Sequence, residues 1–369
     1  MKRYCHPSIF ILFTVIISLF LERYYTFDFR YFFYFIILLI AIFTLSSLKF
    51  KYWQKIVFQF IFLIILFFIY FSLIDGFNPK YEVFDKYFLN KMGFFKNIKY
   101  FNFLKSIILG DRTYLSRDYK KIFSLTGSYH FIAISGLHFG ILASILSVIF
   151  KYFKKEMKNI FIIVFLFIYL IMINFYVSAF RAFIMISVYL IAKILNKKSY
   201  PLNIWAFTTI FLLVLNKTYF NNLGFWLSVI ATLSILLILE NLSVINHKLI
   251  KIFVISLNVQ LFLLPIILYY FNHINIMSPI LNVFGVFFLY PIIIIGVILI
   301  FPLPHYFTRL FVRIVEKLIF LFVSYIEYFK KEIFIIRCEE FFVWMIILYY
   351  LFFIPLFFYI KNIFKKRKR

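Results

Sequence analysis

The sequence predicts an all-α integral membrane protein with about 10–12 transmembrane helices. Of its 369 residues, 65% are hydrophobic, and the mean hydropathy is +0.98, which is more apolar surface than a soluble fold can cover. Runs near the length that crosses a membrane as a helix recur along the chain. Basic residues gather in alternate loops between these runs, as expected for a multi-pass protein.

Twelve hydrophobic segments are candidate membrane spans. They cover residues 7–21, 31–48, 56–74, 122–150, 159–177, 178–195, 201–216, 223–239, 249–270, 280–301, 314–329 and 341–360. The first follows Lys2 and Arg3 and lacks a small-residue cleavage site, so we expect a retained signal anchor. The eleventh begins with Arg313, Glu316 and Lys317, and a helix lying in the membrane interface is the alternative there.

The distribution of Lys and Arg predicts that both termini are cytoplasmic. Loops around residues 49–55, 151–158, 193–198 and 248–251, together with the C-terminal KKRKR, are rich in lysine. Short basic loops stay on the cytoplasmic side of a membrane. The chain then divides into N-terminal transmembrane helices, an outer loop, a main transmembrane region, and C-terminal amphipathic or transmembrane helices with a basic tail. These four parts are residues 1–74, 75–121, 122–301 and 302–369.

The predicted outer loop, residues 75–121, is basic and aromatic. It carries ten Lys and Arg residues against five acids, interleaved with Phe and Tyr. One interpretation is an amphipathic helix on lipid headgroups. The other is a surface for single-stranded nucleic acid, where lysines meet phosphates and rings stack on bases. The candidate contacts to nucleic acid are Lys86, Lys91, Lys96 and Lys99.

The segment GSYHFIAISGLHFGIL, residues 127–142, is unusually polar for a membrane span. On a continuous helix, His130, Ser135 and His138 fall within an arc of about 140°. Such a stripe faces other helices or water rather than acyl chains. At Ser135 and Gly136 the helix is expected to loosen or break, which is tolerated only inside protein or beside a water-filled cavity. Close packing with hydrogen-bonded histidines is the alternative.

Arg181 lies in a predicted span and has no acidic neighbour in the sequence. Between Tyr119 and Val315 the acids are Glu156 and Glu240, both at predicted cytoplasmic helix ends. A guanidinium deep in a membrane needs a polar or charged partner or has a functional role, unless its side chain snorkels to the outer surface. Cation-coupled transporters place Asp or Glu in their core, so this core instead suits an anionic passenger.

The common motifs of nucleotide, metal and hydrolase chemistry are missing from the sequence. It contains no Walker A run, no His-rich metal box and no Gly-x-Ser-x-Gly nucleophile turn. We therefore expect no catalytic residue, no metal and no cofactor. Ser135 and His138 still allow an intramembrane Ser/His hydrolase as an alternative, although no acid is placed to orient the histidine.

Three segments resemble the ComEC family of DNA-uptake channel proteins. They are GDRTYLSRDYKKIFSLTGSYHFIAISGLHFGIL (110–142), the stretch from SAFRAFIM to ATLSIL (178–236), and NVQLFLLPIILYYFNHINIMSPILN (258–282). The segments keep their order along the chain. On this basis the chain is identified as a member of the family, and residues 122–301 are similar to its competence transmembrane domain.

The resemblance implies a multi-pass channel in the bacterial cytoplasmic (inner) membrane that passes single-stranded DNA inward during natural transformation. The residues then expected to line the DNA path are His130, Ser135, Gly136, His138, Arg181, Gln260 and Asn282. The other positions matching the family pattern are Gly110, Asp111, Arg112, Gly127, Gly224, Ser228 and Pro265. A permease for another anion, such as a lipid-linked phosphate, is the alternative that the acid-poor core also permits.

Family members often carry two further domains. One is an oligonucleotide-binding domain in the outer loop, for which residues 75–121 are too few. The other is a C-terminal metallo-β-lactamase-like domain proposed to degrade the non-transported strand, with no counterpart in these 369 residues. We therefore expect partners besides single-stranded DNA and membrane lipid. These are a separate DNA-binding protein, a nuclease and a cytoplasmic motor, and an oligomer is a further expectation.

Overall fold

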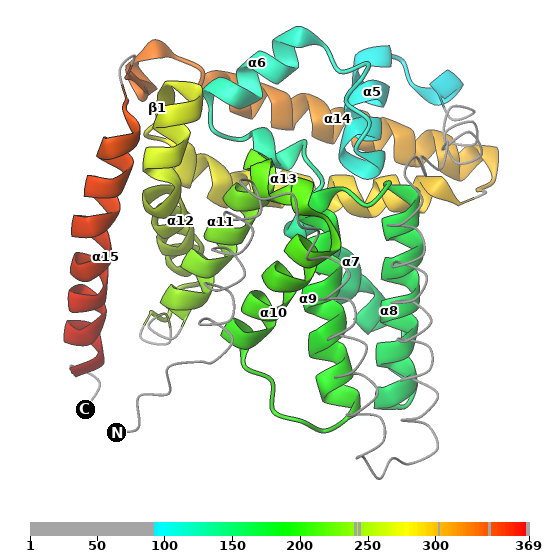
Figure 1. Ribbon diagram of the computed structural model, residues 1–369. Helices are drawn as coiled ribbons and strands as arrows, with labels where there is room; N and C mark the ends of the chain where they lie inside the picture. The colour runs from blue at the N-terminus through cyan, green and yellow to red at the C-terminus, as the bar shows by residue number, and fades with distance from the viewer. Residues whose placement is uncertain (1–91, 240–241, 243–244, 302, 339–340, 367–369) are drawn as a thin grey trace. The chain divides into compact units, whose positions relative to one another are not determined.

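The computed structural model describes residues 92–239, 242, 245–301, 303–338 and 341–366. In this part of the chain nearly all regular structure is α-helical (Figure 1), which confirms the predicted fold class. The predicted spans in residues 1–74 lie outside the described residues, so nothing about them is tested. The cytoplasmic placement of both termini also stays a prediction.

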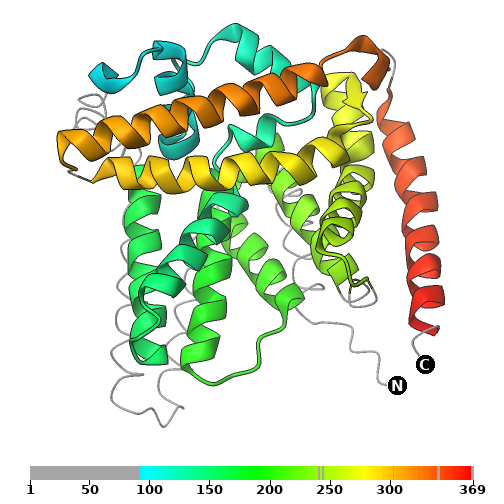
Figure 2. The ribbon, with the colours of Figure 1, turned by 180° about the vertical axis from the view of Figure 1, so that it is seen from behind.

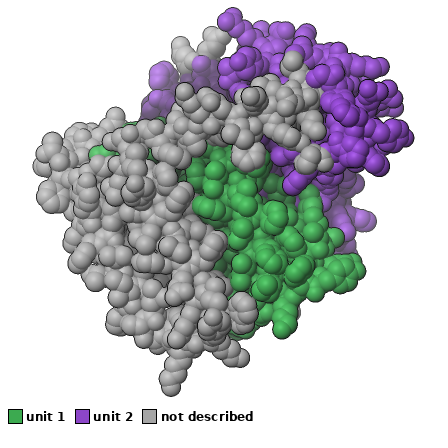
Figure 3. All heavy atoms as spheres, turned by 90° about the vertical axis from the view of Figure 1, so that its right-hand side faces the viewer, with its two compact units in different colours: residues 1–80, 142–229 green, residues 81–141, 230–369 purple. Residues whose placement is uncertain are grey.

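The packing of the elements divides the chain into two units, coloured differently in Figure 3. The described part of the first unit is residues 142–229. That of the second is residues 92–141, 230–239, 242, 245–301, 303–338 and 341–366. Two helices, α7 (Gly136–Ile149) and α11 (Leu223–Leu239), have residues in both units.

The first unit is built from three long helices that pack side by side. They are α8 (Lys155–Met172), α9 (Val177–Ile194) and α10 (Pro201–Leu215), followed by η3 (Lys217–Asn221). Helix α9 packs against both α8 and α10. Proline favours the first helical position, and Pro201 begins α10. The indole N–H of Trp205 donates a 3.0 Å hydrogen bond to the carbonyl of Val229, which ties α10 to α11.

Besides the shared parts of α7 and α11, the described residues of the second unit form six α-helices, three short 3-10 turns and two short strands. Its elements are η1 (Met92–Phe94), α5 (Ile98–Leu109), α6 (Arg117–Leu125), η2 (Tyr129–Phe131), α12 (Lys248–Phe271), β1 (His273–Asn275), α13 (Ser278–Ile300), α14 (His305–Tyr328), η5 (Glu332–Phe334), β2 (Ile335–Arg337) and α15 (Val343–Lys366). Helices α13 and α14 lie side by side and antiparallel, and both run crosswise to α12 and α15 (Figures 1 and 2).

An aromatic cluster forms the core of the second unit. The ring of Phe322 on α14 lies 5.7–6.2 Å from the rings of Phe103, Phe123 and Phe131, all fully or nearly fully buried. Gly285 on α13 makes room for Phe131, because a Cβ at Gly285 would lie 2.6 Å from that ring. The close packing of α13 against these rings therefore depends on a residue without a side chain.

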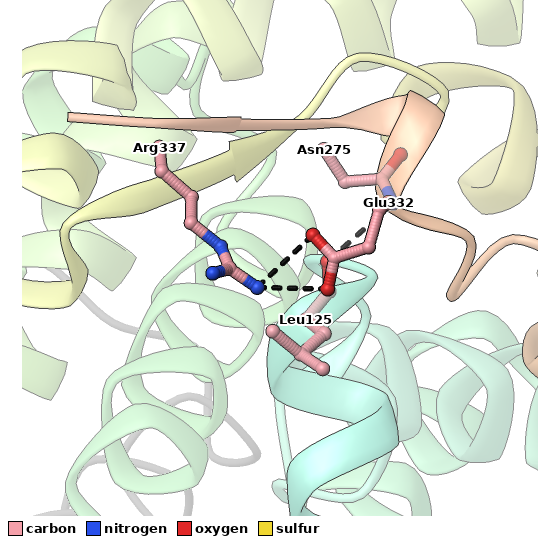
Figure 4. Close-up of polar contacts among 4 residues, drawn as sticks. All are labelled: Leu125, Asn275, Glu332 and Arg337. Atoms are coloured by element: carbon pink, nitrogen blue, oxygen red, sulfur yellow. Dashed lines mark hydrogen bonds and ion pairs between the residues drawn. The ribbon is translucent and has the colours of Figure 1, made fainter.

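Strands β1 and β2 form a small antiparallel pair in which His273, Ile274 and Asn275 lie opposite Arg337, Ile336 and Ile335. Figure 4 shows two polar contacts around this pair. Asn275 of β1 donates to the carbonyl of Leu125 at the end of α6. Arg337 of β2 pairs with Glu332 at 2.7 Å, but both side chains are exposed, so this ion pair contributes little stability.

The structure corrects the prediction of one span over residues 122–150. Helix α6 ends at Leu125, and α7 begins only at Gly136. The peptide N–H of Ser128 donates to the carbonyl of Phe123, and that of Gly127 donates to Ser124, which is the Schellman pattern that ends helices. Gly127 has a φ of +68°, a conformation that glycine adopts at little cost.

The other predicted spans match described helices within a few residues at most ends, but α14 begins nine residues before its predicted span. Among the described residues, α9, α12 and α13 are long and apolar enough to cross a membrane. Shorter apolar helices cover 136–149, 201–215, 223–239 and 343–357. The exact number of spans stays a prediction. The segment 75–121, expected as a loop, contains α5 and the first part of α6 in its described residues, and α5 is largely buried.

Candidate functional site

The corner between α5 and α6 holds three of the family positions. Gly110 caps α5 with a φ of +75°, and its N–H donates to the carbonyl of Ser106. Arg112 donates to the hydroxyl of Tyr129 at 3.3 Å and lies 5.6 Å from the centre of that ring. The corner is therefore held to the η2 turn by a cation–π contact as well as by a hydrogen bond.

Asp111 forms a 2.8 Å ion pair with Lys105 of α5, whose side chain is only 3% exposed. Burial of the Asp111 carboxyl opposes its ionisation, but hydrogen bonds from Lys105 and Thr113 outweigh this, and the net result is a lowered pKa. A buried ammonium without a partner is costly. Asp111 therefore has a clear structural role, which is to neutralise Lys105.

The structure brings Ser135 and His138 into direct contact at the start of α7. The peptide N–H of Ser135 donates to Nδ1 of His138 at 3.2 Å, and the Ser135 hydroxyl lies 3.2 Å from the same nitrogen. His138 is the third residue of α7, so its ring takes the place of the Glu or Gln of a capping box. Because Nδ1 accepts, the neutral ring carries its proton on Nε2. Within the described residues, Nε2 of the fully buried His138 has no hydrogen-bond partner.

His130 does not share a helix with His138. It lies in the η2 turn, is exposed, and packs its ring 4.3 Å from that of Phe131. His130, Ser135 and His138 therefore do not share one continuous helix, and α7 begins at Gly136, where the sequence suggested a loosened or broken helix. That these residues line a DNA path stays a prediction.

In the first unit, Arg181 and Ser228 are partners. Arg181 lies one turn into α9 and is 4% exposed. Its Nη2 donates a 2.7 Å hydrogen bond to the Ser228 hydroxyl on α11, and its Nη1 lies 4.0 Å from the sulfur of Met185. Among the described residues, Nε of Arg181 has no hydrogen-bond partner and no carboxylate pairs with the guanidinium. Gly224 lies one turn before Ser228 on α11, against Asn222.

Gln260 joins a hydrogen-bonded cluster at the junction of α12, β1 and α13. Its amide donates to the carbonyl of Asn275 at 3.0 Å and accepts from Ser278 at 3.3 Å. The Asn275 amide group in turn donates to the carbonyl of Phe329 at the end of α14. Gly127 fits against Ser278, since a Cβ there would lie 3.2 Å from the serine side chain. This cluster fixes how four segments of the second unit meet.

Two further family positions lie in the helices of the second unit. The side-chain amide of Asn282 on α13 donates to the Ser256 hydroxyl of α12 at 3.2 Å. Its side-chain oxygen Oδ1 is buried without a partner in the described chain. Pro265 lies inside α12 and has no N–H to donate to the carbonyl of Leu261. The Tyr349 hydroxyl of α15 donates to that carbonyl at 2.9 Å, which replaces the missing helical bond.

The candidate outer contacts are only partly described. Lys96 and Lys99 are exposed at the start of α5, while Lys86 and Lys91 lie outside the described residues. Sequence reasoning missed Glu316, which is 9% exposed and accepts the peptide N–H groups of Lys96 and Asn97 at 2.7 and 3.1 Å. The position of Glu316 near the start of the predicted span 314–329 gave no signal that its carboxylate would cap another helix.

The described residues offer polar and cationic groups but no metal-binding cluster of His, Cys, Asp and Glu. The Ser135 hydroxyl lies within reach of His138, yet its own peptide N–H already occupies Nδ1. Among the described residues, the arrangement comprises a buried guanidinium at Arg181 with no paired carboxylate, and a Ser135–His138 contact with no acid beside the ring.

Comparison with known proteins agrees with these motifs. The family model described as "Competence protein" matches residues 107–362. The chain is 29% identical over 214 residues to "ComE operon protein 3" of Bacillus subtilis (strain 168), an alignment that covers 56% of this chain and 27% of that relative. No solved structure matches. Since the family match covers more than half of the 369 residues, this membrane protein belongs to the competence protein family.

Proposed function

We propose that this chain forms the path by which one strand of DNA crosses the cytoplasmic membrane inward during natural transformation. Membership of the competence protein family supports the process. The apolar helices α9, α12 and α13 support a membrane location. The buried groups of the first unit indicate the chemistry of the passenger.

Arg181 is the observation that carries the proposal. Its guanidinium is 4% exposed, and a charge at such a position is stable only when it is paired. The hydroxyl of Ser228 satisfies one N–H, but a hydroxyl does not neutralise a cation. The single acid of residues 142–229, Glu156, is exposed in the first turn of α8. A phosphate of a passing strand would supply the counter-charge that the described residues do not, in the fork geometry that guanidinium prefers.

We further propose that the chain is not an enzyme. A Ser/His hydrolase needs a histidine nitrogen free to take the serine proton and an acid to orient the ring. Nδ1 of His138 already accepts the peptide N–H of Ser135. In the described chain no hydrogen bond or ion pair joins His138 to a carboxylate.

A lipid-linked phosphate would satisfy Arg181 as well as DNA does, because both present the same anion. Family membership favours DNA. Passage of a polymer also requires a source of directed force and a supply of single strands, so we propose a cytoplasmic motor, a nuclease and a separate DNA-binding protein as partners. An oligomeric channel is part of the same proposal.

The test is internalisation of labelled DNA by a strain that lacks the chain and by the same strain complemented with it. Surface-bound DNA is removed with nuclease, and the protected label inside the cytoplasmic membrane is measured. We expect the deletion to leave surface binding intact and abolish the protected label, and complementation to restore it. Normal internalisation in the deletion strain would contradict the proposal. A lipid-linked phosphate accumulating in that strain would favour the other anion.

A further inference from the structure

Helix α14 (His305–Tyr328) of the second unit has one face buried and one face exposed. The buried face packs on α13 and α5. Its members are spaced by three and four residues, as a single helix face requires, and are Thr308, Val312, Val315, Glu316, Ile319, Phe322, Val323 and Ile326. This inner face is part of the core of the second unit, and the outer face is the one that a ligand can reach.

The outer face combines a basic stripe with an apolar stripe. Arg309, Arg313 and Lys317 follow one another at intervals of four residues and are exposed. None of them makes a hydrogen bond, ion pair or cation–π contact within the described chain. About 100° per residue places the apolar stripe directly beside them. That stripe consists of the exposed residues Leu310, Ile314 and Leu321.

This helix carries two acids, Glu316 and Glu327, and neither forms an ion pair with the basic stripe among the described residues. The carboxylate of Glu316 is turned inward, where it accepts the peptide N–H groups of Lys96 and Asn97 at the start of α5. This contact also brings the exposed Lys96 and Lys99 to the same region of α14. The surface therefore presents a cluster of cations, which we call the α14 basic surface: Lys96, Lys99, Arg309, Arg313 and Lys317.

The direction of α14 within its unit suits a membrane surface. Helix α12 is a candidate membrane span, whereas α14 is not among the candidate spans. In both ribbon views α14 runs crosswise to α12 and α15 (Figures 1 and 2). Helix α13 is also long and apolar enough to cross a membrane, but it lies antiparallel beside α14 and crosswise to α12 (Figure 2), so α12 and α13 do not both cross the bilayer upright. If α12 crosses it, α13 and α14 lie along the bilayer plane. A helix with basic and apolar stripes side by side is the type that binds there.

We propose that the outer face of α14 binds the headgroups of anionic phospholipids. The phosphates contact the α14 basic surface, and Leu310, Ile314 and Leu321 enter the boundary between headgroups and acyl chains. Charge alone would equally attract nucleic acid. The same face also exposes the rings of Tyr306 and Phe320, so the presence of rings does not decide between the two. The aliphatic stripe and the direction of α14 favour lipid, because aliphatic side chains enter the acyl boundary but give a base no ring to stack on. The proposal stands independently of the passenger proposed above.

The test measures binding of phosphatidylglycerol to the purified full chain in mild detergent, by native mass spectrometry, with phosphatidylcholine and a single-stranded oligonucleotide as the other ligands. The variant is R309Q/R313Q/K317Q. The matched control, K154Q/K155Q/K197Q, removes the same charge from exposed lysines of the other unit. A charge-preserving variant, R309K/R313K, separates loss of charge from loss of folding.

We expect R309Q/R313Q/K317Q to bind phosphatidylglycerol about tenfold or more weakly, with phosphatidylcholine unchanged. The control and R309K/R313K are expected to bind like the original chain. Equal weakening in the control would show an effect of net charge alone and would overturn the proposal. Weakening in R309K/R313K, unchanged lipid binding, or selective loss of oligonucleotide binding would each overturn it as well.

Discussion

The peptide N–H of Ser135 donates a 3.2 Å hydrogen bond to Nδ1 of His138, three residues along the chain. This single contact starts α7, fixes the tautomer of a fully buried ring, and competes with any use of Ser135 as a nucleophile. Two residues that stand out in the sequence as candidates for chemistry therefore have a structural task. Nε2 of His138 is available for a further role, because it is buried and unpartnered within the described chain.

The first prediction concerns this pair. Ser135→Ala keeps the peptide N–H and the helix start, so we expect DNA uptake and thermal stability close to those of the original chain. His138→Phe removes the acceptor and should destabilise the fold by about 1 kcal/mol, the usual cost of a lost helix cap. Size-exclusion chromatography after heating measures both variants in detergent.

His138→Gln is the control, because the side-chain oxygen of a Gln at this position can accept a hydrogen bond from the peptide N–H of Ser135. It should be more stable than His138→Phe. Complete loss of uptake in a stable Ser135→Ala protein would instead show that the hydroxyl has a role in uptake beyond the start of α7.

The second prediction concerns the ion pair of Lys105 with Asp111. Asp111→Asn leaves a buried ammonium without its counter-charge and should cost about 1–3 kcal/mol, whereas Lys105→Met in the same background should recover part of the loss. The pKa of Asp111 is lowered in the folded chain, so the pair stabilises the fold above the ordinary carboxyl pKa near 3.8. That stability is lost as the pH falls through the lower folded value.

Melting temperatures measured from pH 7 down to pH 3 check this dependence. The original chain should lose stability at the acid end more than the Lys105→Met/Asp111→Asn double variant does. Parallel curves for the two proteins would show that the pair does not contribute in the expected way.

The third prediction concerns Pro265 and Tyr349, which lie on neighbouring helices. Tyr349→Phe leaves the Leu261 carbonyl without the donor that replaces its missing helical partner, at a cost of about 0.5–1.5 kcal/mol. In a Pro265→Ala background, the restored N–H of residue 265 can serve that carbonyl. Tyr349→Phe should then cost less. A double-mutant cycle of melting temperatures measures the difference, and strictly additive effects would argue against the replacement.

Much of the fold was predictable from the sequence because membrane-spanning helices consist of long apolar runs. The bounds of α9, α10 and α11 differ from the predicted spans by no more than one residue. The break at Gly127 was missed because the apolar character continues through Phe131 and Ile134. The sequence signal for this break was Gly127, because glycine often ends a helix, but a hydropathy average does not register that tendency.

The candidate site was predictable by residue type but not by arrangement. Gln260 and Asn282 were expected beside a passenger, and the structure shows them hydrogen-bonded to Asn275 and Ser256. Partners 15 and 26 residues away cannot be read from local spacing, because helix packing decides them. For Arg181 the sequence left a snorkelling and a buried position open, and the structure shows the side chain buried beside Ser228.

The most direct test of the proposed DNA path is uptake by Arg181 variants, with internalised DNA divided by the amount of protein in the membrane. Lys193→Gln is the control, because Lys193 lies on the same helix but is exposed. We predict that Arg181→Leu lowers uptake per protein by roughly ten- to a hundredfold, the loss of one charge-assisted contact. Arg181→Lys should keep part of the uptake, and the control all of it. Uptake that follows membrane abundance in every variant would contradict a role for Arg181 in contacting the strand.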